Sequence, residues 1–152
     1  MQKQAAFWLA ISCRPEILIL DEPTAGLDPK QRILLRNLIG KIALNKIVLI
    51  STHVVSDVEY IAKELILLSQ GEILCKGTHR ELTKSLQGRV WEVCAGEDEA
   101  ARVGEFGSVC GLAKTAEGIS VRLLAEKEPP FPCRALSPTL EDVYLHYFGE
   151  LG

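Results

Sequence analysis

Short runs of large apolar residues and longer amphipathic stretches alternate along the first half of the chain. Residues 17–20 and 47–50 each hold four consecutive large apolar side chains, several of them β-branched. Runs of this kind are typical of strands that are buried on both faces at the centre of a parallel sheet. Between the two runs, apolar residues recur at helical spacing over residues 29–42. The pattern therefore predicts a strand, a helix and a second strand.

Local signals mark where the helices begin. Asp28 is a good N-cap and Pro29 suits the first helical position, so the central helix is expected to start there. Ser56 and Glu59 have the spacing of a capping box, which opens a helix. We expect that helix to carry a buried apolar stripe that reaches residue 65.

The remaining elements of the first half are also expected to be regular. Residues 5–10 are compatible with the packed face of an opening helix, which Pro15 ends. Residues 65–75 hold two apolar runs around a Gly-containing turn and predict a hairpin. Thr78 and Glu81 form a second candidate capping box, which opens a short helix. Strands alternating with helices, followed by an edge hairpin, indicate α/β organisation.

Beyond about residue 86 the segments become shorter. Strands are predicted at residues 90–93, 108–114 and 119–124, a helix at 97–103 and a linker at 128–132. A final helix is expected from about Ser137, with a buried stripe that consists of Leu140, Val143, Tyr144, Tyr147 and Phe148. The fold class is thus α/β for residues 1–86, followed by a small α+β domain of the ferredoxin-like kind in residues 87–152.

Composition excludes several classes of protein. The formal net charge of −3 provides no basic footprint for nucleic acid. No apolar run approaches the length of a membrane span. The five cysteines are odd in number and have no C-x-x-C pair, so neither a disulfide framework nor a zinc site is indicated, and a reducing cytosol fits best.

Polar residues that can carry chemistry follow both apolar runs. Asp21 and Glu22 directly follow the first run, and Ser51, Thr52 and His53 follow the second. A charge is costly to bury unless it is paired or bound to a metal, so the carboxylates are expected in a ligand crevice where the parallel strands end. Each residue has a structural alternative: a solvated strand end for the two carboxylates, and a satisfied structural histidine for His53.

Together these residues resemble three motifs of one family. The apolar strand ending in Asp21 and Glu22, the loop at residues 25–28, and residues 51–53 look like the Walker B motif, D-loop and H-loop of ABC transporter ATPases. The ordered set of three is much more specific than any one of them. The resemblance implies a P-loop NTPase fold with a parallel sheet, and ATP and Mg²⁺ as cofactors.

The resemblance also implies a role for each residue. Asp21 would hold Mg²⁺, directly or through water, against the nucleotide phosphates. Glu22 would be the general base that activates the attacking water, and His53 would contact the γ-phosphate. Asp28 would reach across the interface to a second ATPase subunit, in a homodimer or a heterodimer, although it caps a helix in any case.

Two further observations narrow the expectation. The 152 residues contain no G-x-x-x-x-G-K-[S/T] phosphate loop and no Leu-Ser-Gly-Gly signature, so we expect a fragment that is inactive alone. Residues 137–145 are similar to the ending of ATPase subunits of bacterial export-type ABC systems, which often carry an accessory domain. The implied partner is a membrane permease, and the implied location is cytoplasmic, at the inner face of the membrane.

Two alternatives remain open at this point. The chain could be a truncated, non-enzymatic interaction or regulatory module, because the front half of the nucleotide-binding domain is missing. It could also be part of a soluble ABC-type ATPase. The sequence offers no indication of the transported substrate.

Overall fold

The computed structural model describes residues 12–13, 15–116 and 118–149, which form parts of two compact units. Unit 1 comprises Met1–Ala62 and unit 2 comprises Lys63–Gly152. The domain boundary predicted between residues 86 and 87 lies within unit 2. The predicted opening helix at residues 5–10 lies outside the described residues.

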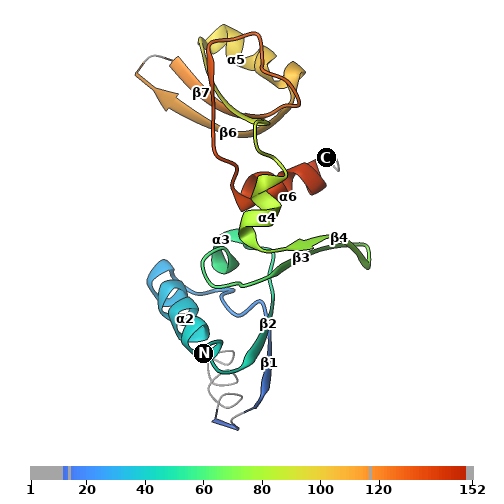
Figure 1. The fold of residues 1–152 in the computed structure, drawn as a ribbon. Helices are drawn as coiled ribbons and strands as arrows, with labels where there is room; N and C mark the ends of the chain where they lie inside the picture. The colour runs from blue at the N-terminus through green and yellow to red at the C-terminus, as the bar shows by residue number, and fades with distance from the viewer. Residues whose placement is uncertain (1–11, 14, 117, 150–152) are drawn as a thin grey trace. The chain divides into compact units, whose positions relative to one another are not determined.

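Unit 1 is built around a parallel pair of strands. Its elements are β1 (Ile17–Asp21), α2 (Pro29–Ile42), β2 (Ile47–Ser51) and α3 (Val55–Val58) (Figure 1). β1 and β2 pair in parallel without a register shift, from Ile17 opposite Ile47 to Asp21 opposite Ser51. The predicted strand, helix and second strand are confirmed, and the two strands end side by side.

One face of the β1–β2 sheet packs into the core of unit 1. Leu18, Leu20 and Ile39 are buried there, and partly buried apolar residues of α2 and β2 surround them. The other face is open, because its four large apolar side chains are between 53% and 71% exposed: Ile17, Ile19, Ile47 and Leu49. The prediction that both strands are buried on both faces is therefore wrong for the described residues, since apolar packing covers one face only.

Helix α2 begins as the sequence predicts. Asp28 is its N-cap, and a side-chain oxygen of Asp28 accepts a hydrogen bond of 2.9 Å from the Gln31 backbone N–H. Pro29 occupies the first turn, where its missing N–H leaves no intrahelical bond unmade.

The predicted capping box of the next helix is wrong. α3 contains only the four residues Val55–Val58, and its N-cap is Val54, which makes no side-chain cap. The helix starts two residues earlier than the Ser56 capping box predicts, because the Thr52 hydroxyl accepts the Val54 N–H at 3.1 Å and turns the chain there. Ser56 therefore lies inside the helix and cannot cap it.

Unit 2 begins with the predicted hairpin. β3 (Leu65–Ser69) pairs antiparallel with β4 (Glu72–Gly77). Gln70 and Gly71 have φ of 50° and 84°, so a two-residue turn of the I′ kind joins the strands. Helix α4 (His79–Lys84) follows, and its capping box between Thr78 and Glu81 is confirmed.

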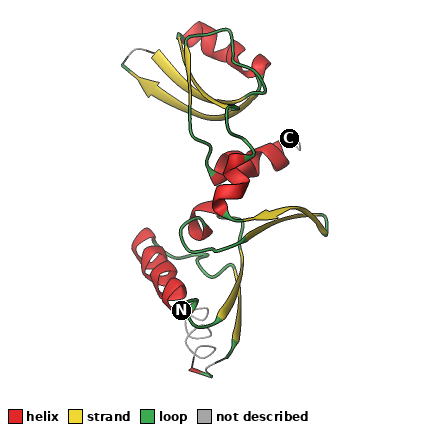
Figure 2. Ribbon diagram, in the orientation of Figure 1, coloured by secondary structure: helices red, strands yellow, loops and turns green. Residues whose placement is uncertain are grey.

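The rest of unit 2 is a four-stranded antiparallel sheet with two helices. Its elements are β5 (Val90–Ala95), α5 (Glu97–Val103), the 3₁₀ helix η1 (Gly104–Phe106), β6 (Ser108–Thr115), β7 (Gly118–Leu124), β8 (Cys133–Ala135) and α6 (Leu140–Phe148). Figure 2 shows helices in red and strands in yellow. The strand order is β6-β7-β5-β8. α5 packs on the sheet over a core that includes Val93, Val103, Val121 and Leu123.

Sequence reasoning missed β8. The strand has three residues and directly follows the proline-rich stretch at residues 128–132, so its run is too short to give a strand signal. It forms because the edge of β5 offers backbone groups from Trp91 to Val93 for antiparallel pairing. The pairing closes that edge of the sheet.

The buried side chains of helix α6 differ in part from the predicted buried stripe. Leu140 and Val143 are buried as expected, whereas Tyr144 is exposed and stacks on Phe148 with ring centroids 4.5 Å apart. Asp142 was not expected in the interior, yet it is buried. The guanidinium of Arg122 on β7 donates to both of its oxygens, Nε at 2.8 Å and Nη2 at 2.6 Å.

This ion pair sets the pKa of Asp142. Burial alone would raise the pKa, but the hydrogen bonds from Arg122 and from the Thr139 amide and hydroxyl outweigh it and lower the pKa below the ordinary 3.8. A carboxyl whose pKa is lower in the folded state stabilises the fold above its unfolded pKa, and the effect disappears as the pH falls through the folded pKa.

We expect Asp142→Asn to lower the free energy of unfolding of unit 2 by about 2 kcal/mol at pH 7, because hydrogen bonds to a charged group are lost. The difference from wild type should shrink below the ordinary pKa of 3.8. Urea unfolding followed through the amide NMR signals of residues 90–124 measures it. The neighbouring, exposed Glu141→Gln is the control. A difference that stays constant from pH 7 to pH 2 would contradict the assignment.

The open face of the β1–β2 sheet predicts self-association of the chain. Burying each large apolar side chain contributes about 1.5–3 kcal/mol, so a second copy can cover this face favourably. Ile19→Lys should shift the mass in light scattering toward that of the monomer. Leu44→Lys, at a residue just beyond α2 that is 73% exposed, should leave the mass unchanged. A monodisperse wild-type monomer would refute the prediction.

Candidate functional site

The predicted site residues Asp21, Glu22 and His53 lie where β1 and β2 end. Because the two strands are parallel and in register, their carboxyl ends share one edge of the sheet. The Ser51 hydroxyl donates to Asp21 Oδ1 at 2.9 Å, and the Glu22 N–H donates to the Ser51 carbonyl oxygen at 2.8 Å. These two bonds join the strand ends just where the carboxylates emerge.

Glu22 holds an unusual backbone conformation. Its φ of 44° lies in the left-handed region, which residues other than glycine rarely adopt. Pro23 follows, and the Ala25 N–H donates to the Glu22 carbonyl at 3.2 Å, so the chain turns sharply at the end of β1. Such strain, typically about 1–3 kcal/mol, persists where the surrounding contacts determine the conformation.

The Glu22 carboxylate is held by two residues of the neighbouring strand end. Oε1 accepts the His53 backbone N–H at 2.9 Å and lies 2.7 Å from His53 Nδ1. Oε2 accepts the Thr52 hydroxyl at 3.2 Å. The hydrogen bond with His53 is the main cause that lowers the pKa of Glu22, so the group is an ionised acceptor at neutral pH.

The surroundings leave both groups accessible to a ligand. The Glu22 side chain is 26% exposed and that of His53 is 77% exposed. Since Nδ1 faces Glu22, the second ring nitrogen of His53, Nε2, is available to a ligand in solvent. A carboxylate has about four lone-pair sites, so Glu22 can still accept a hydrogen bond from a water molecule.

Asp28 is placed differently from the other predicted residues. It is exposed, and its Oδ1 caps α2 through Gln31. The structure thus brings Asp21, Glu22 and His53 together through Ser51 and Thr52, and it places Asp28 at the end of the loop that leaves the site.

Sequence reasoning did not assign a role to four residues that build this site. Ser51 and Thr52 were recognised only as a polar strand end, yet their hydroxyls bond the two carboxylates. Thr24 and Asp57 are both buried, and the Thr24 hydroxyl donates to Asp57 Oδ2. No local spacing rule could pair them, because 33 residues separate them along the chain.

The donor set fits Mg²⁺ held with a nucleotide, but not an all-protein metal cage. In the part of the chain that the structure describes, no group of three or more His, Cys, Asp or Glu side chains could hold a metal ion. Mg²⁺ usually keeps several waters and takes one or two carboxylates plus substrate phosphates. The exposed carboxylate of Asp21, with one oxygen bonded to Ser51, meets that requirement.

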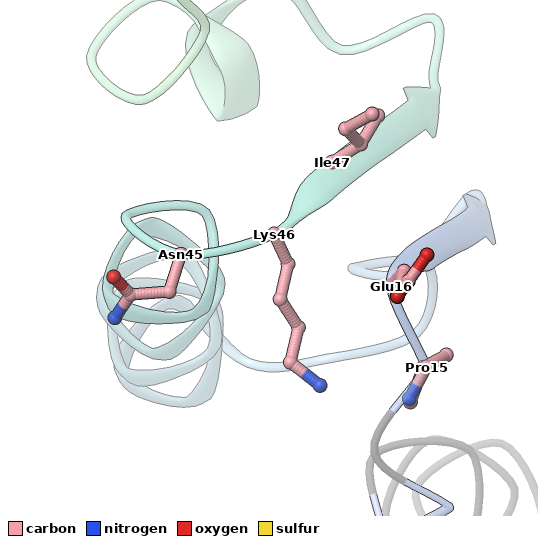
Figure 3. A pocket seen from close by; sticks show the side chains of 5 residues that line it. All are labelled: Pro15, Glu16, Asn45, Lys46 and Ile47. Atoms are coloured by element: carbon pink, nitrogen blue, oxygen red, sulfur yellow. The ribbon is translucent and has the colours of Figure 1, made fainter.

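A surface hollow lies at the opposite end of the strands (Figure 3). Its lining consists of Pro15, Glu16, Asn45, Lys46 and Ile47, which precede or begin β1 and β2. Ligands of open α/β sheets bind outside the carboxyl ends of the strands, whereas this hollow is at the amino ends. We therefore place the candidate site at Glu22 and not in the hollow.

Known proteins with similar sequences are ATP-binding components of ABC transporters. An uncharacterized ABC transporter ATP-binding protein of Synechocystis sp. is 29% identical over 150 residues, which cover 91% of this chain and 41% of that protein. The energy-coupling factor transporter ATP-binding protein EcfA2 of Clostridioides difficile is 37% identical over 94 residues, 60% of this chain and 33% of that protein. The chain is related to ABC transporter ATP-binding proteins.

The similarity to this family extends over both units. The ABC-type organic anion transporter ABCA8A of Mus musculus is 30% identical over 138 residues, 86% of this chain and 8% of that protein. Matches that cover 86% and 91% of the chain must include residues of unit 1 and unit 2. The chain spans about two fifths or less of the length of these relatives. No family model matches it.

No helix among residues 12–13, 15–116 and 118–149 is long and apolar enough to cross a bilayer.

Proposed function

We propose that this chain is the later part of the ATP-hydrolysing subunit of an ABC transporter. The observation that carries the proposal is the Glu22 carboxylate, held by His53 and Thr52 at the carboxyl ends of two parallel strands. An ionised carboxylate beside an accessible imidazole suits hydrolysis of a phosphoanhydride, because one group can orient water and the other can donate to a phosphate oxygen. The relatives support ATP as the nucleotide.

Each site residue has a separate role in this proposal. Asp21 holds Mg²⁺, directly or through water, and the bound ion supplies charge neutralisation at the phosphates. Glu22 is the catalytic base, which orients the attacking water and accepts its proton. His53 donates from its exposed ring to the γ-phosphate.

The low pKa of Glu22 has a consequence for this chemistry. The hydrogen bond from His53 keeps Glu22 ionised but makes it a weaker base, so Glu22 acts first by positioning the water.

The partners follow from the same proposal. Asp28 lies at the exposed start of α2 and reaches a second ATPase subunit, in a homodimer or a heterodimer. The complex drives a membrane permease from the cytoplasmic face, in the direction of export. The tail at residues 137–145, which resembles export-type subunits, supports that direction.

We also propose that residues 1–86 belong to the nucleotide-binding domain and residues 87–152 to an accessory domain of the ferredoxin-like kind. The antiparallel order β6-β7-β5-β8, with α5 between β5 and β6, supports this class. One feature departs from the full pattern: residues 125–132 connect β7 to β8 without a helix, and α6 follows β8 instead.

One observation favours a second function. The open apolar face of the β1–β2 sheet, formed by Ile17, Ile19, Ile47 and Leu49, suits a non-enzymatic module that binds another protein. In that function the partner would bind the open face, so variants at Glu22 should leave it unchanged while they abolish ATP hydrolysis.

Glu22→Gln in the intact subunit should abolish hydrolysis and preserve ATP binding. The amide keeps the shape of the side chain but cannot accept the proton, so turnover should fall by about 10²–10⁴-fold. Steady-state phosphate release and equilibrium nucleotide binding measure the two effects. Glu72→Gln, at an exposed residue of β4, is the matched control. Unchanged turnover in Glu22→Gln would exclude Glu22 as the base.

The 152 residues alone should bind ATP only weakly and should not hydrolyse it. They contain no glycine-rich phosphate loop, whose backbone amides and lysine provide most of the phosphate contacts in P-loop proteins. Isothermal titration with Mg²⁺ and ATP, and a phosphate-release assay, check this. Micromolar affinity or steady release of phosphate by the purified chain would overturn the prediction.

A further inference from the structure

We infer that a buried hydrogen bond between Thr24 and Asp57 positions Glu22 against His53. The inference rests on the proposed function, because it assigns two positioning residues to the same site. Neither residue belongs to the set Asp21, Glu22, Asp28 and His53 that the motifs identify.

Thr24 and Asp57 are almost completely shielded from water. Thr24 is 2% exposed and Asp57 is 4% exposed, and the Thr24 hydroxyl donates to Asp57 Oδ2. An unpaired polar group at such a position destabilises the fold, and more strongly when it is charged. Once the two loops are folded, the carboxylate of Asp57 therefore holds Thr24 in place.

Thr24 controls the loop that carries Glu22. It lies two residues after Glu22, and the Ala25 N–H closes the turn at the Glu22 carbonyl. The Thr24 carbonyl accepts the Leu27 N–H at 3.1 Å, which continues the same loop toward Asp28. Fixing Thr24 thus fixes the strained turn at Glu22 and the start of the loop that leads to α2.

Asp57 controls the loop that carries His53. Its N–H donates to the Val54 carbonyl at 3.0 Å, and the Val54 N–H donates to the Thr52 hydroxyl at 3.1 Å. The neighbouring Ser56 carbonyl accepts Arg36 Nη1 of α2 at 2.7 Å. Asp57 is therefore joined through short backbone links to both residues that bond the Glu22 carboxylate.

The solvent-accessible contacts of Glu22 with His53 are too weak to hold the two loops in position by themselves. The His53 side chain is 77% exposed, and a contact with an exposed group contributes little because water competes for that group. The Thr24–Asp57 bond is shielded from that competition. It closes a ring that runs from Glu22 through Thr24, Asp57 and Val54 to Thr52 and back to Glu22.

The spacing of the two loops matters for catalysis. A base must lie within hydrogen-bond reach of the water that it activates, and a small misplacement lowers the rate strongly. Losing the buried bond should therefore lower turnover without changing the affinity for ATP, since neither Thr24 nor Asp57 contacts the nucleotide in the proposal.

Three substitutions test the inference. Thr24→Val removes the hydroxyl and keeps the shape, and Thr24→Ser restores the hydroxyl. Thr83→Val is the matched control, because the Thr83 hydroxyl donates to carbonyls of its own helix, α4. Amide hydrogen exchange by NMR on the chain reports the N–H of His53, which donates to Glu22 Oε1.

Thr24→Val should lower the protection of the His53 amide by about tenfold, and Thr24→Ser should restore it. The protection of Ile39 in the core of unit 1 should stay unchanged in both variants. Unchanged protection at His53, or an equal loss at Ile39, would overturn the inference. If Thr24→Val does not fold, Asp57→Asn is used instead, because it weakens the same bond. Unchanged protection of the His53 amide in Asp57→Asn would also overturn the inference.

Kinetics of the intact subunit separate this inference from the proposed function. Thr24→Val should lower kcat for ATP and leave KM unchanged, with recovery in Thr24→Ser. A wild-type subunit that hydrolyses ATP and a Thr24→Val variant with the same kcat would overturn the inference and leave the proposed function intact. A wild-type subunit that does not hydrolyse ATP would overturn the proposed function. Amide hydrogen exchange at His53 would still test whether the Thr24–Asp57 bond positions Glu22.

Discussion

The parallel pairing of β1 with β2 is the interaction on which the candidate site depends. Parallel strands in register end at the same edge, so residues that are distant in sequence meet there without any further folding step. Asp21 and Glu22 come from one strand end, and Ser51, Thr52 and His53 from the other. The hydrogen bonds of the two carboxylates then follow from this register, because Asp21 lies directly opposite Ser51.

The two sides of the same sheet have different roles. Leu18 and Leu20 pack with Ile39 of α2 and hold the strands in place. The opposite face leaves four large apolar side chains exposed, which is unusual for a sheet that carries a site at its end. The short ladder is thus stabilised from one side only, and its carboxyl edge relies on the bonds between the loops, including the buried pair Thr24 and Asp57.

Local patterns were sufficient for much of this structure, and interactions across the chain explain the rest. Asp28 and Thr78 act as predicted N-caps, because a cap is decided by neighbouring residues. The capping box at Ser56 failed because the Thr52 hydroxyl turns the chain earlier, so that Val54 is the N-cap. The buried pairs of Thr24 with Asp57 and of Arg122 with Asp142 join distant residues, so no local spacing rule could reveal them. The ferredoxin-like class of the second domain stays a prediction, and so do the roles of the site residues, which rest on the resemblance.

The central claim is that Glu22 and His53 face the γ-phosphate of ATP from one strand edge. A structure of the intact subunit with Mg²⁺ and ATP, solved for the Glu22→Gln variant, tests it most directly. The account predicts the residue 22 side chain about 2.6–3.2 Å from a water in line with the γ-phosphate, and His53 Nε2 at a similar distance from a γ-phosphate oxygen. Nucleotide bound away from the carboxyl ends of β1 and β2 would contradict it.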